Sequence, residues 1–289
     1  MAQTQMALDS LDFDATVALA AKVAPHVDIL EIGTPCIKHN GIELLKTLRA
    51  KFPNNKILVD LKTMDAGFYE AEPFYKAGAD ICTVLGTADI GTIKGVIDVA
   101  NKYGKQAQVD LINVTDKKAR TLEVAKLGAH IIGVHTGLDQ QAAGQTPFAD
   151  LALVTGLKTG AKVSVAGGVK AATVKQVVDA GADIVVAGAA IYGAADPAAS
   201  AKEITGLAHG SSASAGGFKW LPWAIAIGAA LLVLSLLTNK APEEAAEAPA
   251  ATEQGVEEAP MEAAPEAAPM EEVAPAEEAA PAEPAPEAQ

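Results

Sequence analysis

The sequence predicts a (β/α)8 TIM barrel, an α/β fold, over residues 1–209. Three observations predict it: short β-branched apolar runs alternate with longer helical stretches, these runs number eight, and a helix-to-strand pattern recurs along the chain. Strands that read as continuous apolar runs are buried on both faces, which is typical of parallel sheets. About 200 residues suffice for one such barrel. An open, doubly wound sheet is the alternative.

Eight apolar runs are the expected strands. They lie at residues 5–9, 28–33, 56–62, 79–86, 106–112, 130–137, 162–168 and 183–191. Several of the stretches between them place apolar residues three or four apart, which is the period of an amphipathic helix. The clearest of these stretches are 17–24, 41–52, 92–104 and 171–182.

An internal repeat supports the number of strands. Segments 76–86, 126–137 and 179–189 share one pattern, in which a helix ends at Gly and a buried strand starts two residues later. Glycine at that position usually adopts a left-handed conformation. Stacked βα units are expected to produce such a recurrence.

The charge of the chain is unevenly distributed. Residues 241–289 contain 14 Glu and no Lys, Arg or Asp, while the net charge of the whole chain is −14, so residues 1–240 sum to about zero. Without a basic patch, a nucleic-acid partner is not expected. Cys36 and Cys82 suggest neither a disulfide framework nor a zinc site. The N-terminus lacks the features of a secretory signal, so we expect a cytoplasmic catalytic domain.

Three further segments follow the predicted barrel. Residues 210–218 read as a flexible Gly/Ser linker. Residues 219–240 are predicted to form a single transmembrane helix, because 220–239 contain no charge and both Trp residues stand at the start. Residues 241–289, rich in Ala, Pro and Glu, are predicted to be a disordered acidic tail. We therefore expect the barrel to be anchored to a membrane at its C-terminal side.

Polar residues and glycines stand at the ends of the predicted strands, where barrels of this class carry their chemistry. These strand-end residues are Asp9, Glu31, Asp60, Lys62, Asp110, His135, Gly167, Gly168 and Gly188. Charged groups within apolar runs are costly to bury unless they are paired or bound to a metal. So many of them at one end of a barrel predict an active site.

The most specific motif is VDLKTMD, residues 59–65. Alternation along a strand puts Asp60 and Lys62 on one face, and Asp65 follows in the loop. We expect the ammonium group of Lys62 to lie between two carboxylates, where it stays charged and can stabilise an oxyanion. A structural salt bridge at the barrel rim is the alternative.

Glu31 stands one predicted strand before Asp60. Because neighbouring strands lie about 4.8 Å apart, the two carboxylates can share a hard cation such as Mg²⁺. Alternatively, Glu31 only pairs with Lys62. His135 ends the sixth strand, where a neutral imidazole would suit removal of a proton next to a carbonyl. A hydrogen-bonded structural histidine is the alternative there.

The last two strands end in VAGGV and VAGAAI. Glycine lets backbone N–H groups approach an anion closely. The loops after strands 7 and 8 commonly form a phosphate site in this fold. We therefore expect phosphate binding near Gly167, Gly168 and Gly188.

Taken together, these motifs resemble the orotidine-monophosphate-decarboxylase superfamily and, within it, the 3-hexulose-6-phosphate synthases. The resemblance covers about residues 1–208 and rests on ALD (7–9), LEIGTP (30–35), VDLKTMD (59–65), GVHTGLDQQ (133–141), VAGGV (165–169) and VVAGAAIYGAADP (185–197). The 3-keto-L-gulonate-6-phosphate decarboxylases share the barrel and the D-x-K-x-x-D motif. They carry Arg shortly after the strand-6 His and after the strand-8 Gly, whereas here TGLDQQ follows His135 and Ala189 follows Gly188.

The resemblance implies an aldol condensation of formaldehyde with D-ribulose 5-phosphate, which gives D-arabino-hex-3-ulose 6-phosphate through an enediolate. It implies Mg²⁺ or Mn²⁺ as cofactor, held by Glu31 and Asp60. In that reaction His135 is expected to be the base and Lys62 to stabilise the enediolate.

The resemblance also assigns supporting roles. Asp9 and Asp65 would orient Lys62 and the sugar hydroxyls. The phosphate would rest on backbone amides, and these are the amides of Gly167, Gly168, Gly188 and Ala189. A homodimer is implied, with the site near the interface and Asp65 a candidate contribution from the partner chain.

Two other functions stay open at this point: a metal-dependent 3-keto-L-gulonate-6-phosphate decarboxylase, and a membrane-anchored scaffold whose barrel has lost catalysis. The resemblance is silent on the C-terminal segments. Our hypothesis is that they tether the enzyme to a membrane where formaldehyde is made or enters.

Overall fold

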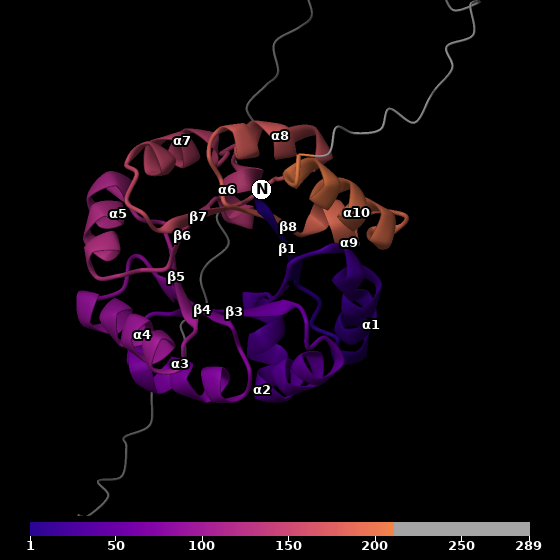
Figure 1. The fold of residues 1–289 in the computed structure, drawn as a ribbon, viewed down its shortest axis with the longest axis horizontal. Helices are drawn as coiled ribbons and strands as arrows, with labels where there is room; N and C mark the ends of the chain where they lie inside the picture. Colours follow the sequence, from indigo (N-terminus) through magenta and orange to yellow (C-terminus); the bar gives the residue numbers. More distant parts are fainter. Residues whose placement is uncertain (211–289) are drawn as a thin grey trace, which may run out of the picture. The chain divides into compact units, whose positions relative to one another are not determined.

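The computed structural model describes residues 1–210, which form a closed barrel of eight parallel strands (Figure 1). The strands follow one another around the barrel in chain order, and β8 pairs with β1 to close it. The predicted (β/α)8 barrel is confirmed. The doubly wound alternative was wrong: an open sheet has two unpaired edge strands, whereas here β1 and β8 pair with each other.

Every predicted run overlaps one observed strand. The strands are β1 (Gln3–Leu8), β2 (Ile29–Ile32), β3 (Lys56–Thr63), β4 (Ile81–Leu85), β5 (Gln106–Asp110), β6 (Ile131–His135), β7 (Lys162–Ala166) and β8 (Ile184–Ala187). Most of them are shorter than predicted, and β2, β4, β6, β7 and β8 end before the glycines that the prediction included in the strands.

The helices form a ring around the strands (Figure 1). They are α1 (Phe13–Val23), the 3₁₀ helix η1 (Ala24–His26), α2 (Thr34–Lys51), α3 (Gly67–Lys76), α4 (Ile90–Lys102), α5 (Lys117–Lys126), α6 (Leu138–Ala142), α7 (Phe148–Gly156), α8 (Ala171–Asp179), α9 (Ala189–Tyr192) and α10 (Pro197–Ala208). The four predicted helical stretches fall in α1, α2, α4 and α8. The second of them covers only part of its helix, because α2 starts earlier and is kinked at Gly41.

Two apolar layers hold the barrel together. The larger one lies between the strands and the surrounding helices. The smaller one fills the barrel itself and consists of Ile29, Leu58, Ile81, Ile131, Ile184 and Val186. Side chains alternate along a strand, so the residue two positions after each of these also faces the interior. Glu31, Asp60 and Thr83 are such residues, and they make the next layer polar.

A repeated contact links neighbouring strands at the N-terminal end of the barrel, which we call the floor. The residue before each even-numbered strand accepts a hydrogen bond from the backbone N–H of the second residue of the preceding strand. The four acceptor–donor pairs are Asp28–Thr4, Asp80–Ile57, His130–Ala107 and Asp183–Val163, at 2.7, 2.9, 3.2 and 2.8 Å.

The sequence repeat has its counterpart at this floor. Its glycines, Gly78, Gly128 and Gly181, have φ angles of 108°, 90° and 93°, which confirms the predicted left-handed position. The following strands start three residues later rather than two, because Asp80, His130 and Asp183 belong to the floor contacts.

The end of α10 also lies at the floor. Nε2 of His209, the residue that follows α10, is 3.1 Å from Oδ2 of Asp28. The same carboxylate oxygen accepts the N–H of Thr4. The last helix is thereby fixed to the start of β2.

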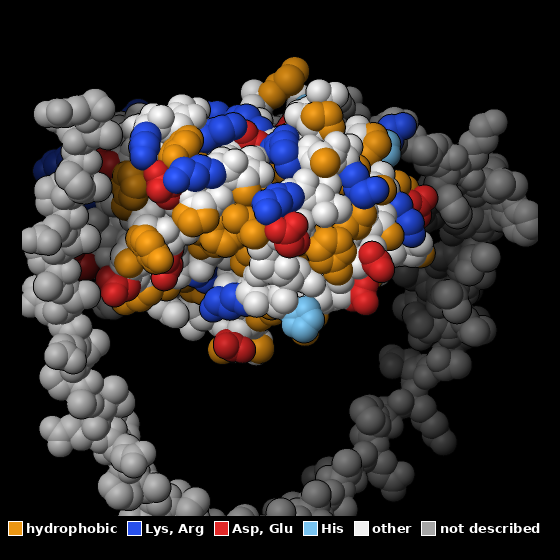
Figure 2. All heavy atoms as spheres, turned by 90° about the horizontal axis from the view of Figure 1, so that it is seen from below, with side chains coloured by type: hydrophobic (Ala, Val, Ile, Leu, Met, Phe, Trp, Pro, Cys, Tyr) orange, Lys and Arg blue, Asp and Glu red, His pale blue; other side chains and the backbone are white. Residues whose placement is uncertain are grey.

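On the flank of the barrel shown in Figure 2, Lys and Arg side chains are interspersed with Asp and Glu, and hydrophobic side chains show between them. Within residues 1–210, none of the helices combines the length and the apolar character that crossing a membrane requires. The predicted transmembrane helix 219–240 and the tail 241–289 lie outside the described residues, as does the linker 210–218 beyond its first residue.

Candidate active site

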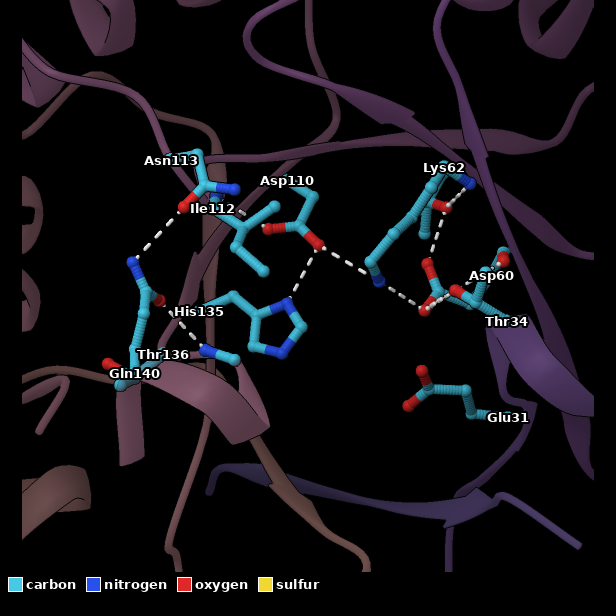
Figure 3. A network of polar contacts seen from close by, with 12 residues as sticks. Glu31, Thr34, Asp60, Lys62, Asp110, Ile112, Asn113, His135, Thr136 and Gln140 are labelled. Atoms are coloured by element: carbon cyan, nitrogen blue, oxygen red, sulfur yellow. Dashed lines mark hydrogen bonds and ion pairs between the residues drawn. The ribbon is translucent and has the colours of Figure 1, made fainter. Parts of the chain in front are cut away.

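A connected group of charged side chains occupies the C-terminal ends of β3, β5 and β6, at the end of the barrel that we call the mouth (Figure 3). Contacts run from Asp60 to Lys62, from Lys62 to Asp110 and from Asp110 to His135. Asp60 and Asp110 are 6% and 3% exposed, so water screens these interactions poorly. The structure therefore brings residues of three predicted strand ends into one site.

Lys62 is held between two carboxylates, as predicted. Its Nζ lies 2.5 Å from Oδ2 of Asp60 and 3.4 Å from Oδ2 of Asp110. Burial alone would lower the pKa of Lys62, but the charges of Asp60 and Asp110 outweigh burial and raise it above its ordinary value. The ammonium group therefore stays charged.

The second carboxylate was predicted wrongly, because it belongs to Asp110 and not to Asp65. Asp65 is exposed, and its Oδ1 accepts the backbone N–H of the next residue, Ala66, at 2.7 Å. The chain turns away from the barrel here, with left-handed φ angles of 47° at Lys62 and 48° at Ala66. The role implied for Asp65 in a partner's site stays a prediction.

Lys62 itself sits in a β-bulge. The pairing register of β3 and β4 shifts between Val59 and Thr63. A left-handed φ is uncommon for a residue with a side chain, and surrounding contacts must stabilise it. One such contact is the hydrogen bond from the backbone N–H of Lys62 to Oγ1 of Thr83, at 2.9 Å. The predicted common face of Asp60 and Lys62 is thus reached through a bulge and not through simple alternation.

His135 is oriented by Asp110. The distance from His135 Nδ1 to Asp110 Oδ2 is 2.8 Å. Burial lowers the pKa of His135, but the hydrogen bond and the charge of Asp110 outweigh burial and raise it. With Nδ1 facing the carboxylate, Nε2 is the nitrogen left to exchange a proton with a bound molecule.

Glu31 and Asp60 form the second part of the site. In Figure 3 the carboxylate of Glu31 points toward the space beside Asp60 and not away from it. Oε2 of Glu31 accepts a hydrogen bond of 2.7 Å from Nε2 of Gln5. Burial and the neighbouring charge of Asp60 raise the pKa of Glu31 to about 8. A proton or a cation stabilises two neighbouring buried carboxylates, because it offsets the repulsion between their like charges.

This pair fits a hard divalent cation. Carboxylate oxygens are the ligands that Mg²⁺ prefers, and it is usually bound by one or two of them, with water filling other positions. Among residues 1–210, no group of three or more His, Cys, Asp or Glu side chains is arranged to hold a metal. A cation held by two carboxylates has further coordination positions for water or substrate oxygens.

Asp9 lies at the open mouth, just after β1. A Cβ atom on Gly33 would lie 2.0 Å from its Oδ1, and one on Gly188 would lie 3.4 Å from its Oδ2. The carboxylate therefore packs closely on Gly33, where a larger residue would collide with it, and contacts Gly188 at an ordinary distance. Partial burial and the charge of Asp60 raise the pKa of Asp9. The role implied for Asp9 stays a prediction.

The four residues expected at the phosphate directly follow β7 and β8: Gly167, Gly168 and Gly188 lie in the loops after these strands, and Ala189 is the first residue of α9. Gly167 and Gly168 have left-handed φ angles of 110° and 68°. A Cβ atom on Gly167 would lie 2.4 Å from the backbone oxygen of Thr136, so a larger residue has no room there. Gly168 and Ala189 are exposed at the mouth, and Gly188 is half-buried. Their location agrees with phosphate binding.

Sequence reasoning missed several side chains that hold this group in place. Asp110 was recognised as a strand-end carboxylate but was given no role. Thr34 and Thr83 donate to Oδ2 and Oδ1 of Asp60 at 2.6 and 2.7 Å. Only the inward alternation of β4 could have indicated Thr83, because a threonine in an apolar strand is otherwise unremarked.

Comparison with known proteins gives the family. The model of the orotidine 5′-phosphate decarboxylase / HUMPS family matches residues 2–204. A 3-hexulose-6-phosphate synthase of Methylomonas aminofaciens is 88% identical over 208 residues, which are 72% of this chain and all of that protein. The chain is also similar to crystal structures of two enzymes.

The first is 3-hexulose-6-phosphate synthase from Salmonella typhimurium, with 41% identity and a TM-score of 0.69; the match covers 73% of this chain and 100% of that one. The second is 3-keto-L-gulonate-6-phosphate decarboxylase from Vibrio cholerae, with 26% identity and a TM-score of 0.65; the match covers 73% of this chain and 99% of that one.

Proposed function

Because the chain belongs to the orotidine 5′-phosphate decarboxylase / HUMPS family, we propose that residues 1–209 condense formaldehyde with D-ribulose 5-phosphate to D-arabino-hex-3-ulose 6-phosphate. This reaction makes the chain an aldehyde-lyase that fixes formaldehyde. The observation that carries the proposal is the 88% identity to a 3-hexulose-6-phosphate synthase over that protein's whole length. The geometry of the mouth agrees with the chemistry of this reaction.

His135 is the base in the proposed reaction. Its Nε2 takes a proton from C1 of ribulose 5-phosphate, and the electron pair left behind forms an enediolate over C1 and C2. Asp110 holds the ring in the required tautomer through Nδ1 and stabilises the imidazolium that results. C1 of the enediolate then attacks the carbon of formaldehyde, and the formaldehyde oxygen takes up a proton.

Lys62 stabilises the negative charge that develops on the substrate oxygens. Its ammonium group is fixed by Asp60 and Asp110 before substrate arrives, so little reorganisation is needed during the reaction. The backbone amides of Gly167, Gly168, Gly188 and Ala189 bind the phosphate. Asp9 orients a sugar hydroxyl in the proposed reaction.

We propose Mg²⁺ or Mn²⁺ as the cofactor, with Glu31 and Asp60 as its protein ligands. When bound, such a cation acts as a Lewis acid toward neighbouring substrate oxygens. The buried Glu31 with its raised pKa supports this assignment, because a cation would offset the repulsion from Asp60.

We also propose a homodimer that uses the connection between β3 and α3. Met64 in this connection and Phe68 and Tyr69 in the first turn of α3 are 54%, 39% and 82% exposed and flank Asp65 in the sequence. Exposed large apolar side chains close together in the chain are typical of an interface. Mixing inactive His135→Asn dimers with inactive Asp65→Asn dimers would test a shared site: subunit exchange should restore roughly a quarter of the sites. No recovery after demonstrated exchange would contradict it.

The membrane anchor is a third proposal, carried by the sequence of residues 220–239, which contain no charged residue. The full-length protein should pellet with membranes, whereas a chain ending at Gly210 should not. Full-length protein in the soluble fraction, next to a control membrane protein that pellets, would contradict the anchor.

The decisive experiment follows the formaldehyde-dependent loss of ribulose 5-phosphate, with and without chelator, beside release of CO₂ from a 3-keto sugar-acid phosphate. Condensation that stops with chelator and returns with Mg²⁺ is expected. CO₂ release as the dominant reaction would favour the decarboxylase, although the decarboxylase structure is the less similar of the two structures compared. Neither activity would favour the scaffold.

A further inference from the structure

Strand β4 contributes no charged side chain to the mouth, yet it contributes Thr83. This threonine is 1% exposed, and its Oγ1 has two partners. It accepts the backbone N–H of Lys62 at 2.9 Å and lies 2.7 Å from Oδ1 of Asp60. A backbone N–H can only donate, so the single hydroxyl proton is free to point to the carboxylate.

The two contacts join both ends of the D-x-K motif. On one side, Thr83 supplies an acceptor for backbone that the β-bulge has shifted out of register. On the other side, it fixes Oδ1 of Asp60, while Thr34 and Lys62 fix Oδ2. Without the hydroxyl, the carboxylate could rotate, and the left-handed backbone at Lys62 would lose one of the contacts that stabilise it.

We propose that Thr83 is a positioning residue for the reaction: it sets the orientation of the Asp60 carboxylate toward the cation and of Lys62 toward the reacting oxygens. The assignment rests on the proposed function but uses a different part of the structure. Partners that orient metal-binding side chains typically change metal affinity or activity by about 10- to 100-fold when they are removed.

The test compares Thr83→Val, which keeps the shape but loses the hydroxyl, with Thr83→Ser, which keeps the hydroxyl. The matched control is Thr4→Val, since Thr4 is a fully buried strand threonine whose hydroxyl has no partner among the described residues. Mn²⁺ affinity is measured by titration without substrate. The values of kcat and KM and the melting temperature are measured on the same proteins.

Thr83→Val should bind Mn²⁺ and turn over about 10- to 100-fold less well. Its KM for ribulose 5-phosphate should stay close to that of the unmodified protein, because the phosphate glycines follow β7 and β8, away from Thr83 on β4. Thr83→Ser and Thr4→Val should behave like the unmodified protein. A merely structural role would lower the melting temperature and leave Mn²⁺ affinity unchanged.

Equal Mn²⁺ affinity and kcat in Thr83→Val and Thr4→Val would overturn the proposal. If Thr83→Val does not fold, Thr83→Ala takes its place, and an Ala variant equal to the Ser variant would overturn it as well. Should the unmodified protein fail to condense formaldehyde, the proposed function fails, while the Mn²⁺ titrations still decide the role of Thr83.

Discussion

At the floor of the barrel, the carboxylate of Asp80 accepts from Arg49 and Lys105 and from the backbone N–H of Ile57. At the mouth, the carboxylate of Glu31 has one side-chain donor, the neutral Gln5, and faces the like charge of Asp60. Burial alone would raise the pKa of both groups. The partners of Asp80 outweigh it and lower its pKa, whereas the pKa of Glu31 rises.

The same chemical group, a carboxylate, therefore serves opposite purposes at the two ends. Paired charges and repeated backbone contacts stabilise the floor, whereas the mouth holds uncompensated charge and a left-handed backbone at Lys62, a residue with a side chain. Such groups lower stability unless a ligand compensates them, which is typical of functional sites. Substitutions at the mouth and at the floor test this comparison.

The largest effect is expected for His135→Asn. Loss of a general base typically costs about 10²- to 10⁴-fold in rate. The melting temperature should change little, because the mouth contributes little to stability. Steady-state kinetics and thermal unfolding of the same sample check this. A large loss of stability with a modest loss of turnover would contradict the claim that the mouth serves catalysis more than stability.

Asp110→Asn adds a pH test. Asp110 raises the pKa of His135, so the acid limb of the rate profile should reflect a histidine pKa above its usual value. Removing the carboxylate should move that limb to lower pH and also reduce the plateau. An unchanged limb would show that another group controls it.

Asp80→Asn is expected to have the opposite profile. Breaking this partly buried network should cost about 2 kcal/mol, which lowers the melting temperature by roughly 5 °C in a domain of this size. Turnover at 25 °C should be unaffected. Asp98→Asn is the control, because the exposed Lys94–Asp98 pair contributes little. Equal effects of the two variants would mean that the Asp80 network contributes no more to stability than an exposed ion pair does.

Glu31→Gln should stabilise the chelator-treated protein. With a folded-state pKa near 8 against 4.5 for the free group, Glu31 takes up a proton on folding between these values. Stability from this group is present below about pH 4.5 and is lost as pH rises toward 8. The variant should therefore melt a few degrees higher at pH 8, with little difference at pH 5. A lower melting temperature at pH 8 would contradict the uncompensated charge.

His130→Asp should have the smallest effect. Burial lowers the pKa of His130, so its stability contribution is present above about 6.5 and is lost as pH falls through that value. Aspartate is found at the other three floor positions. It can still accept the backbone N–H of Ala107, and it removes the loss of stability that protonation of the histidine causes. The difference in melting temperature between pH 7.5 and 5.5 should shrink, whereas substitution of the exposed His39 should not change it.

Much of this architecture could be predicted from the sequence because it follows from local patterns. Apolar runs and their spacing gave the eight strands in order, and strand-end polarity located the mouth. The bulge at Lys62 could not be predicted, since a left-handed lysine is imposed by tertiary contacts such as that from Thr83. The pairing of Lys62 with Asp110 likewise depends on where two distant strand ends meet in space.

The floor residues were within reach of the sequence but were not identified. The repeat placed Asp80, His130 and Asp183 at equivalent positions before strands. The same polar residue types occur before strands and after them. Only the position relative to the strand tells whether such a residue stabilises the barrel or belongs to the active site.

The contact between His209 and Asp28 holds the last residues that the structure describes on the side of the barrel remote from the reacting groups. The end of α10 therefore takes no part in the catalytic opening, and a substitution at His209 would alter the stability of the barrel without changing the groups that meet the substrate.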